Sequence, residues 1–448
     1  MGVKSKGITL VLFFLGLSAT FPLCFSDANQ RPNTFSASGS RFGSAVFPVQ
    51  GNVYPLGHYT LSLGIGHPPK LYDLDIDSGS DLTWVQCDAP CIRCTKPRDQ
   101  LYKPNNNLVQ CVDQMCAGVQ ASNHHCGAPD DQCDYEVEYA DQGSSLGVLV
   151  QDYFPLRFTN GSVLRPRLAF GCGYDQKYSG SNSPPSTAGV LGLGNGKTSI
   201  LFQLHSLGLS RNVVGHCFSG RGGGFLSFGD DLVPSSGIVW TPMLSSSIEK
   251  HYASGPADLL FNGKPTTVKG LEVIFDSGSS YTYFNSQAYK TLVNLVTNDL
   301  KGKKLNRATD DTSLPICWKG AKPFKSLADV KNYFKPLALS FTKTKNVQLH
   351  IPPEAYLIVS KHGNVCFGIL NGSEVGLENL NIIGDISLVD KMVIYDNEKQ
   401  QIGWVSANCD RLPNVDRDFD DEFSQSYTAN MGVFSERCPA NYDITDCK

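Results

Sequence analysis

The stretch Leu74-Asp75-Ile76-Asp77-Ser78-Gly79-Ser80 decides the fold that we predict for this chain, because it occurs twice. Its second copy is Val273-Ile274-Phe275-Asp276-Ser277-Gly278-Ser279, which places the aspartates Asp77 and Asp276 199 residues apart. In each copy an apolar run reaches an aspartate and continues into a Gly/Ser turn, a pattern typical of a buried strand that enters a tight loop. One such motif is ordinary turn chemistry. Two copies, one in each half of the chain, predict two related lobes that each present one carboxylate at a shared cleft.

A second repeated pattern supports this duplication. The pattern of two hydrophobic residues followed by a glycine occurs once in each half. It ends at Gly192, 115 residues after Asp77, and at Gly384, 108 residues after Asp276. Two neighbouring carboxylates cannot both ionise easily, so they share a proton and divide the roles of acid and base. This chemistry activates a water molecule without a metal. We therefore expect no metal site and no cofactor.

On these motifs the chain resembles the pepsin-like aspartic proteases, and among them the plant nucellin-like branch, from roughly Tyr59 to Asn408. The resemblance implies an all-β, mainly antiparallel, bilobal pepsin-like acid protease fold with short helices. It also implies that Asp77 and Asp276 are the catalytic pair of an aspartic endopeptidase. Four serines would support the pair. The loops would be braced against each other by Ser78 and Ser277, and the outer carboxylate oxygens would accept hydrogen bonds from Ser80 and Ser279. In this family the repeated glycine lets a strand pass close beside the catalytic loop.

Two aromatic residues are expected at the substrate cleft. Residues 135–139 alternate between polar and apolar and lead through a Gly/Ser turn into residues 148–152, which predicts a β-hairpin. In the family that the chain resembles, a tyrosine on such a flap contacts a tryptophan seven residues past the first aspartate. Tyr139 and Trp84 stand at these places, although the hairpin tip is longer than the family's usual Gly-Asp-Gly.

Length and composition favour a folded secreted protein. A chain of 448 residues with 41% hydrophobic and 18% charged residues is globular and long enough for two lobes. The formal net charge of −4 gives no reason to expect nucleic acid as a partner. Past the leader, no apolar run in the sequence is long enough for a membrane helix. We expect a monomer without a membrane anchor that acts on a protein or peptide substrate.

The chain divides into five predicted segments. Lysines followed by a short apolar run predict a signal peptide over residues 1–26, and residues 27–58 are a short pro-segment or linker without a clear helical pattern. Residues 59–240 form the N-terminal β lobe with a cysteine-rich insert, residues 241–410 the C-terminal β lobe, and residues 411–448 an acidic tail. The protein is thus expected to be a zymogen in the secreted or endomembrane lumen, whether extracellular, cell wall or vacuole.

Within the second lobe, Ser286 is expected to cap a helix that reaches about Val296. Residues 391–397 and 401–405 resemble the closing strands of that lobe. Asp385, which directly follows the repeated glycine, is interpreted as a structural residue.

Cysteines and glycan acceptors fit the same compartment. Of 15 cysteines, Cys24 would leave with the leader, and the even remainder predicts disulfides. A zinc site in the insert is the alternative, although paired histidine spacing is absent. Spacing does not fix the pairing, but the family resemblance implies one disulfide, Cys317 with Cys366. Asn160 and Asn371 each open an Asn-Gly-Ser pattern, which predicts N-glycans on a glycoprotein.

The alternative function is a catalytically silent binding or inhibitor protein on the same fold, such as a plant inhibitor of secreted glycanases. The presence of both aspartates, the bracing serines, Trp84 and Tyr139 favours the enzyme. Other hydrolytic mechanisms find no support, because neither His-Glu-x-x-His nor Gly-x-Ser-x-Gly occurs. A structural cell-wall glycoprotein would carry Pro or Ser repeats, which this sequence lacks.

Overall fold

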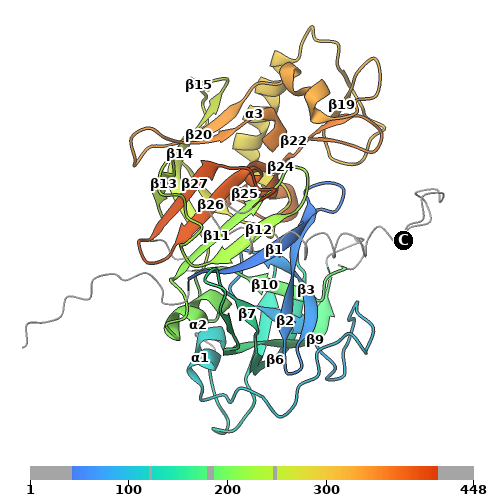
Figure 1. The fold of residues 1–448 in the computed structure, drawn as a ribbon. Helices are drawn as coiled ribbons and strands as arrows, with labels where there is room; N and C mark the ends of the chain where they lie inside the picture. The colour runs from blue at the N-terminus through green and yellow to red at the C-terminus, as the bar shows by residue number, and fades with distance from the viewer. Residues whose placement is uncertain (1–42, 121–123, 179–185, 246–249, 412–448) are drawn as a thin grey trace, which may run out of the picture. The chain divides into compact units, whose positions relative to one another are not determined.

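The computed structural model describes residues 43–120, 124–178, 186–245 and 250–411 (Figure 1). The predicted signal peptide, the first half of the predicted linker and all but the first residue of the predicted tail lie outside these ranges. Within them, antiparallel strands dominate and the helices are short, as the sequence predicts.

The largest sheet has thirteen strands in the spatial order β13-β27-β26-β11-β12-β1-β2-β3-β10-β4-β9-β6-β5. Its strands are β1 (Ala45–Asn52), β2 (His58–Ile65), β3 (Lys70–Asp77), β4 (Trp84–Gln86), β5 (Asp134–Glu138), β6 (Ser144–Tyr153), β9 (Arg167–Lys177), β10 (Gly189–Gly192), β11 (Val213–Phe218), β12 (Gly224–Phe228), β13 (Val239–Pro242), β26 (Lys391–Asp396) and β27 (Gln401–Ser406).

A second sheet has eight strands in the order β21-β20-β14-β16-β25-β17-β24, with β15 paired to β14. Its strands are β14 (Ala253–Phe261), β15 (Lys264–Pro265), β16 (Leu271–Phe275), β17 (Thr282–Phe284), β20 (Leu337–Phe341), β21 (Val347–Ile351), β24 (Ile369–Asn371) and β25 (Ile382–Ile383). Two smaller sheets contain β18 (Asn306–Arg307), β19 (Cys317–Lys319), β22 (Leu357–Val359) and β23 (Val365–Phe367), and β7 (Leu156–Arg157) and β8 (Val163–Leu164).

Helices occupy little of the described chain. The α-helices are α1 (Gln114–Gln120), α2 (Ile200–Ser206), α3 (Ser286–Asp299) and α4 (Asp385–Leu388), and the 3₁₀ turns are η2 (Leu327–Asp329), η3 (Lys331–Tyr333), η4 (Pro353–Ala355) and η5 (Gly372–Val375). The predicted helix is α3, but its cap is Asn285, whose side chain accepts a hydrogen bond from the backbone N–H of Ala288. Ser286 instead begins the helix, because an N-cap needs an acceptor side chain one residue before the first helical turn.

The strands around the two aspartates repeat one arrangement. In the first half, β2 is antiparallel to β3, β3 parallel to β10, β10 antiparallel to β4, and β4 parallel to β9. The second half repeats these four orientations in the series β14, β16, β25, β17 and β24. Strand β3 ends at Asp77, and β16 ends one residue before Asp276. The duplicated motifs therefore stand at equivalent strand ends, as the repeated sequence predicts.

Strand β1 lies inside the segment 27–58 that we interpret as a pro-segment or linker. It pairs with β12 and β2, and Ala45 and Val49 are fully buried. Several consecutive residues of β1 are buried, so the strand lacks the polar and apolar alternation that marks a half-buried strand. Folded structure therefore begins before residue 59, where the sequence analysis places the start of the first lobe.

Strands β26 and β27 form at the predicted positions, but they join a sheet that also contains strands of the first half. β26 pairs with β11, a strand of the first half, and β27 pairs with β26 and β13 (Figure 1). The sequence pattern identifies a buried strand but carries no information on the strand it joins. The end of the chain's second half is thus hydrogen-bonded to the first half, and it does not close a sheet of its own.

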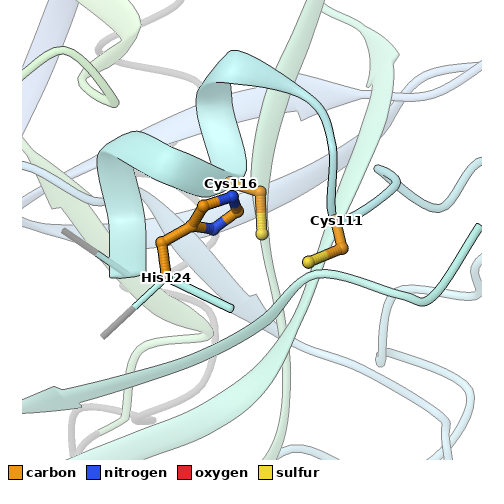
Figure 2. Close-up of side chains that lie close together, drawn as sticks. All are labelled: Cys111, Cys116 and His124. Carbon is orange, nitrogen blue, oxygen red and sulfur yellow. The ribbon is translucent and has the colours of Figure 1, made fainter. Parts of the chain in front are cut away.

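The described cysteines form six disulfides. These are Cys87–Cys172, Cys91–Cys94, Cys111–Cys126, Cys116–Cys133, Cys217–Cys409 and Cys317–Cys366. In the insert, Cys111 and Cys116 lie beside His124, the kind of cluster that can hold a metal (Figure 2). Both sulfurs are already bonded to other cysteines, so neither is a thiolate ligand for zinc. The structure thus supports the disulfide interpretation of the insert over the zinc alternative.

Candidate active site

Each duplicated loop holds its carboxylate by the same two contacts. Asp77 Oδ1 accepts a hydrogen bond of 2.8 Å from the backbone N–H of Gly79, and its Oδ2 accepts one from the hydroxyl of Ser80. Asp276 repeats both contacts, at 2.9 Å and 2.7 Å, with the donors Gly278 and Ser279. Both outer oxygens thus meet the serines that the resemblance assigns to them, and each carboxylate is fixed in orientation by its own loop.

Ser78 and Ser277, which we call the serine brace, join the two loops. The backbone N–H of Ser78 donates to Ser277 Oγ at 3.0 Å, and the N–H of Ser277 donates to Ser78 Oγ at 2.9 Å. Each hydroxyl donates across to the other half, from Ser78 to the carbonyl of Phe275 at 3.1 Å and from Ser277 to that of Ile76 at 3.0 Å. Four reciprocal bonds between fully or almost fully buried groups fix the distance between the loops.

The inner oxygens of the two carboxylates face one common volume. A Cβ atom added to Gly79 would lie 2.7 Å from Asp276 Oδ1 and 3.1 Å from Asp77 Oδ1. One added to Gly278 would lie 2.4 Å from Asp77 Oδ1 and 3.3 Å from Asp276 Oδ1. The structure therefore brings together the two aspartates that the sequence pairs, and glycine at both positions keeps the space between them open.

The environment of this pair favours a shared proton. Burial raises the pKa of Asp77, the nearby charge of Asp276 raises it further, and the hydrogen bonds from Ser80 and Gly79 act in the opposite direction. Behind the pair, burial and then the charge of Asp276 hold the pKa of Asp385 well above its ordinary value. The backbone N–H of Asp385 donates to the carbonyl of Ser279 at 2.8 Å, so this residue also supports the second loop.

The predicted flap is the hairpin of β5 and β6. Tyr139 begins its turn, which the N–H of Tyr139 closes by donating to the carbonyl of Gly143 at 2.8 Å. Trp84 Nε1 donates to the hydroxyl of Tyr139 at 2.6 Å. The hairpin thus carries Tyr139 to Trp84, which is the contact that the family resemblance predicts between these two residues.

Comparison with curated proteins identifies the family. An aspartic proteinase of Oryza sativa subsp. indica is 45% identical over 384 residues, which cover 83% of this chain and 92% of that protein. The chain belongs to the plant pepsin-like aspartic proteases. Aspartic proteinase 39 of Arabidopsis thaliana is 30% identical and covers 82% of the chain and 78% of its own length.

Family models and solved structures agree with this plant aspartic protease assignment. The models described as xylanase inhibitor N-terminal and C-terminal match residues 59–230 and 253–406. Basic 7S globulin from soybean has a TM-score of 0.65 at 17% identity over 82% of this chain and 96% of its own. The aspartic proteinase from Irpex lacteus has a TM-score of 0.57 at 15% identity over 82% and 98%. The predicted pepsin-like fold is confirmed.

The two predicted glycan acceptors of this plant aspartic protease differ in exposure. Asn160 lies at the turn between β7 and β8, where its Oδ1 accepts hydrogen bonds from the backbone and hydroxyl of Ser162 at 3.0 and 2.7 Å. Asn371 is only 8% exposed, and its amide donates to Glu374 at 2.8 Å. A glycan on Asn371 conflicts with this burial, whereas one on Asn160 stays a prediction.

A group of polar residues that the sequence does not predict lies beside the first loop. Lys250 Nζ lies 3.0 Å from Asp81 Oδ1, and Asp81 Oδ2 accepts a hydrogen bond of 2.6 Å from Thr198. Burial lowers the pKa of the neighbouring His251, although the charge of Asp276 opposes the shift. Asp81 lies 169 residues from Lys250 and 117 from Thr198, so no local pattern could have revealed the cluster.

Of the described helices, none is both long and apolar enough to cross a membrane.

The flap contact yields the first testable prediction. Tyr139→Phe should lower kcat/KM about tenfold, because the hydroxyl that accepts the hydrogen bond of Trp84 is lost while the ring stays. Steady-state kinetics on a peptide substrate at acidic pH would measure the effect. Tyr153→Phe, which removes an exposed hydroxyl at the far end of β6, is the matched control. Equal activity of Tyr139→Phe and the control would contradict a role for this hydroxyl in closing the flap.

Proposed function

We propose that this chain is an aspartic endopeptidase that hydrolyses peptide bonds of an extended substrate at acidic pH, with Asp77 and Asp276 as its catalytic pair. The observation that carries the proposal is the volume shared by the two inner oxygens, Asp77 Oδ1 and Asp276 Oδ1, between two loops tied by the serine brace. That volume suits a water molecule within hydrogen-bond reach of both carboxylates. Relatives named aspartic proteinases support the reaction class.

The proposed mechanism uses the single proton that the pair holds. The ionised carboxylate takes a proton from the water as the water oxygen attacks the scissile carbonyl carbon. The protonated carboxylate donates its hydrogen to the carbonyl oxygen, which becomes part of a neutral tetrahedral intermediate. A proton then passes to the amide nitrogen as the carbon–nitrogen bond breaks. No metal or cofactor is required for these steps.

The remaining expectations are part of the same proposal. The hairpin that carries Tyr139 would close over an extended protein or peptide substrate. The family models, which match residues 59–230 and 253–406, support the proposed lobes 59–240 and 241–410. Six disulfides fit a secreted or endomembrane-lumen compartment. We further propose a monomer made as a zymogen, and a place in the nucellin-like branch.

A catalytically silent binding or inhibitor protein is the second candidate. The family models are named for xylanase inhibitors, and one solved structure of similar fold is basic 7S globulin from soybean. The geometry of this chain favours the enzyme, because a silent protein has no need for two carboxylates that share one buried volume. Tight xylanase binding by a chain that cleaves no denatured protein at any pH would favour the inhibitor instead.

Proteolytic activity should decrease as the pH rises from acidic towards neutral. Below the raised pKa of Asp77 the pair holds its proton, and activity should fall as pH rises through that pKa because the proton is lost. The sign for stability is the same, since a carboxyl group whose pKa rises on folding stabilises the protein at low pH and loses that contribution as pH increases. Digestion of a denatured protein across an acidic to neutral pH series, with and without pepstatin, tests this. Pepstatin-insensitive activity that increases towards neutral pH would refute the proposal.

A further inference from the structure

A short segment at the start of the second half, residues 250–252, is bonded to the strand that leads to Asp276. We call this segment the connector. The backbone carbonyl of Tyr252 accepts a hydrogen bond of 2.9 Å from the N–H of Phe275, the last residue of β16. Tyr252 is fully buried, and β14 begins at the next residue. The connector is therefore fixed to the second catalytic loop through the residue that directly precedes Asp276.

The first catalytic loop is bonded to the segment that follows β10. The backbone N–H of Leu193 donates to the carbonyl of Asp77, and the N–H of Gly194 donates to the carbonyl of Ser80, both at 2.7 Å. Both carbonyls belong to the loop that carries the catalytic carboxylate. Residues 193 and 194 therefore hold the loop at its beginning and near its end.

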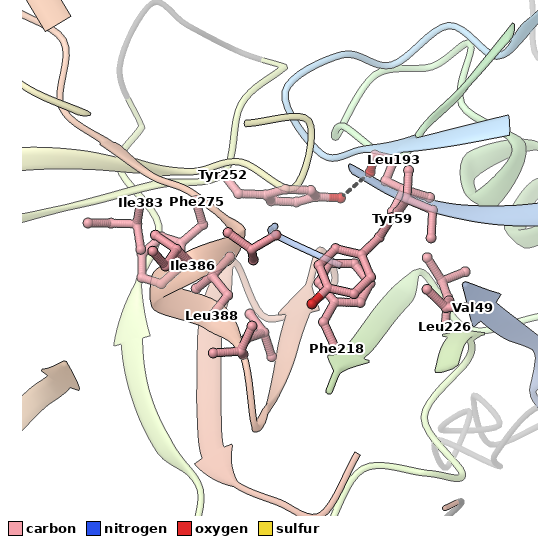
Figure 3. Packing of buried hydrophobic residues seen from close by; sticks show 14 of the residues in the cluster. Val49, Tyr59, Leu193, Phe218, Leu226, Tyr252, Phe275, Ile383, Ile386 and Leu388 are labelled. Atoms are coloured by element: carbon pink, nitrogen blue, oxygen red, sulfur yellow. Dashed lines mark hydrogen bonds between the residues drawn. The ribbon is translucent and has the colours of Figure 1, made fainter. Parts of the chain in front are cut away.

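The connector meets this same segment from the other side. The carbonyl of Lys250 accepts a hydrogen bond of 3.0 Å from the N–H of Asn195. Figure 3 shows the hydroxyl of Tyr252 donating to the carbonyl of Leu193, at 2.7 Å. The connector is thus linked by hydrogen bonds to the first catalytic loop as well as to the second.

One ion pair joins the connector to the first catalytic loop directly. Lys250 Nζ lies 3.0 Å from an oxygen of Asp81, whose side chain is only 8% exposed, while that of Lys250 is 46% exposed. The other carboxylate oxygen of Asp81 accepts the hydroxyl of Thr198. An ion pair between two hydrated surface groups contributes little. Here one partner is buried, so loss of the ammonium group would leave a buried charge with a single side-chain donor.

We propose that Lys250 is a positioning residue of the proposed protease reaction, whose ammonium group holds Asp81 and with it the end of the first catalytic loop. The proposal rests on the proposed function, because the loop in question carries one member of the catalytic pair. Asp81 directly follows Ser80, whose hydroxyl donates to Asp77 Oδ2. A carboxylate that moves towards water for want of its cation would displace this hydroxyl.

The serine brace and Lys250 fix different parts of the first loop. The brace holds it at Ser78, next to the catalytic aspartate, and leaves the far end of the loop free to pivot. Lys250 holds the loop at Asp81, three residues further along the chain. Two separate points of attachment to the second half define the direction of Asp77 as well as its distance from Asp276. Small displacements of a catalytic group lower the rate of reaction, so this second attachment matters for turnover.

Kinetics of two matched lysine variants test the proposal. Lys250→Met keeps an unbranched side chain without its charge, and kcat should fall about fivefold while KM changes less than about twofold. The control is Lys331→Met. Lys331 is also 46% exposed and lies 2.8 Å from Glu354, but that carboxylate is 40% exposed and belongs to the same half. This variant should keep the wild-type kcat. Equal kcat values for the two variants would overturn the proposal.

A conservative exchange and a double variant exclude a purely structural role. Lys250→Arg restores the cation and should recover most of the wild-type kcat. In an Asp81→Asn background, Lys250→Met should cause no further loss, since its partner charge is already absent. Either an Arg variant as slow as Lys250→Met or a further fivefold loss in the double variant would overturn the proposal. The Arg and Met comparison changes no buried residue and remains decisive if Asp81→Asn does not fold.

Hydrogen–deuterium exchange separates this inference from the proposed function, because it needs no activity. The amide hydrogens of Leu193 and Gly194 are bonded to the first catalytic loop, so they should exchange about tenfold faster in Lys250→Met than in Lys331→Met. Mass spectrometry of peptides that contain these two residues measures the difference. Equal exchange in the two variants would overturn the inference even in an active enzyme. If the wild-type protein cleaves no substrate, the proposed function fails, and the exchange rates still show whether Lys250 holds the loop.

Discussion

Asp77→Asn and Asp276→Asn should each lower kcat by about a thousandfold or more, because neither amide can hold or release the proton that the pair shares. Asparagine keeps the shape of aspartate and one acceptor oxygen for the loop N–H that Gly79 or Gly278 donates. The serine brace is formed by other residues and should stay intact. Cleavage of a denatured protein at acidic pH, followed by mass spectrometry of the products, measures the loss.

The thermal stability of these variants shows whether activity is lost because the catalytic groups are changed or because the protein unfolds. Burial raises the pKa of Asp77, so ionising this carboxyl costs folding free energy near neutral pH, and a neutral amide avoids that cost. The melting temperature of Asp77→Asn at neutral pH should therefore equal or exceed that of the wild type. Asp73→Asn, an exposed substitution on the same strand β3, should retain full activity. Proteolysis at wild-type rates in both catalytic variants would exclude Asp77 and Asp276 as the pair.

The sequence was most informative where local chemistry and repetition coincide. Asp77 and Asp276 each follow a buried strand and precede a Gly/Ser turn, and a turn of that kind forms from neighbouring residues alone. The flap hairpin was predictable for the same reason, since alternation and a turn identify two adjacent strands. Repetition then implied that the two loops meet, because duplicated halves place equivalent loops at equivalent positions.

The contacts that join distant segments could not be predicted in this way. The pairing of β26 with β11, the ion pair of Lys250 with Asp81 and the bond from His216 to Tyr395 each connect residues more than 150 positions apart. The hydrophobic periodicity of a sequence indicates that a strand is buried, but it does not indicate which strand lies beside it. Strand β1 was missed for a related reason, because burial on both faces removes the alternation on which the interpretation depends.

Gly384→Ala should destabilise the protein by about 3 kcal/mol or more, through overpacking against backbone atoms that cannot move aside. A Cβ at this position would lie 2.1 Å from the carbonyl oxygen of Tyr281 and 2.4 Å from that of Ser279. The backbone of Gly384 has φ −88°, which alanine adopts freely, so the cost arises from the clash and not from backbone strain. This is the close approach that the repeated hydrophobic-hydrophobic-Gly pattern predicts.

The clash should also lower activity, because Ser279 is the donor to Asp276 Oδ2 and must shift to admit the methyl group. Urea unfolding and kcat at acidic pH would measure both effects on one variant. Gly118→Ala in α1 is the control, since its Cβ would lie 3.3 Å from the methyl group of Thr198 and 3.9 Å from Lys197 Cβ, without a backbone clash, and alanine favours a helix. A Gly384→Ala protein as stable and active as Gly118→Ala would mean that β25 does not press against the second catalytic loop, and the equivalence of the two halves around their aspartates would fail with it.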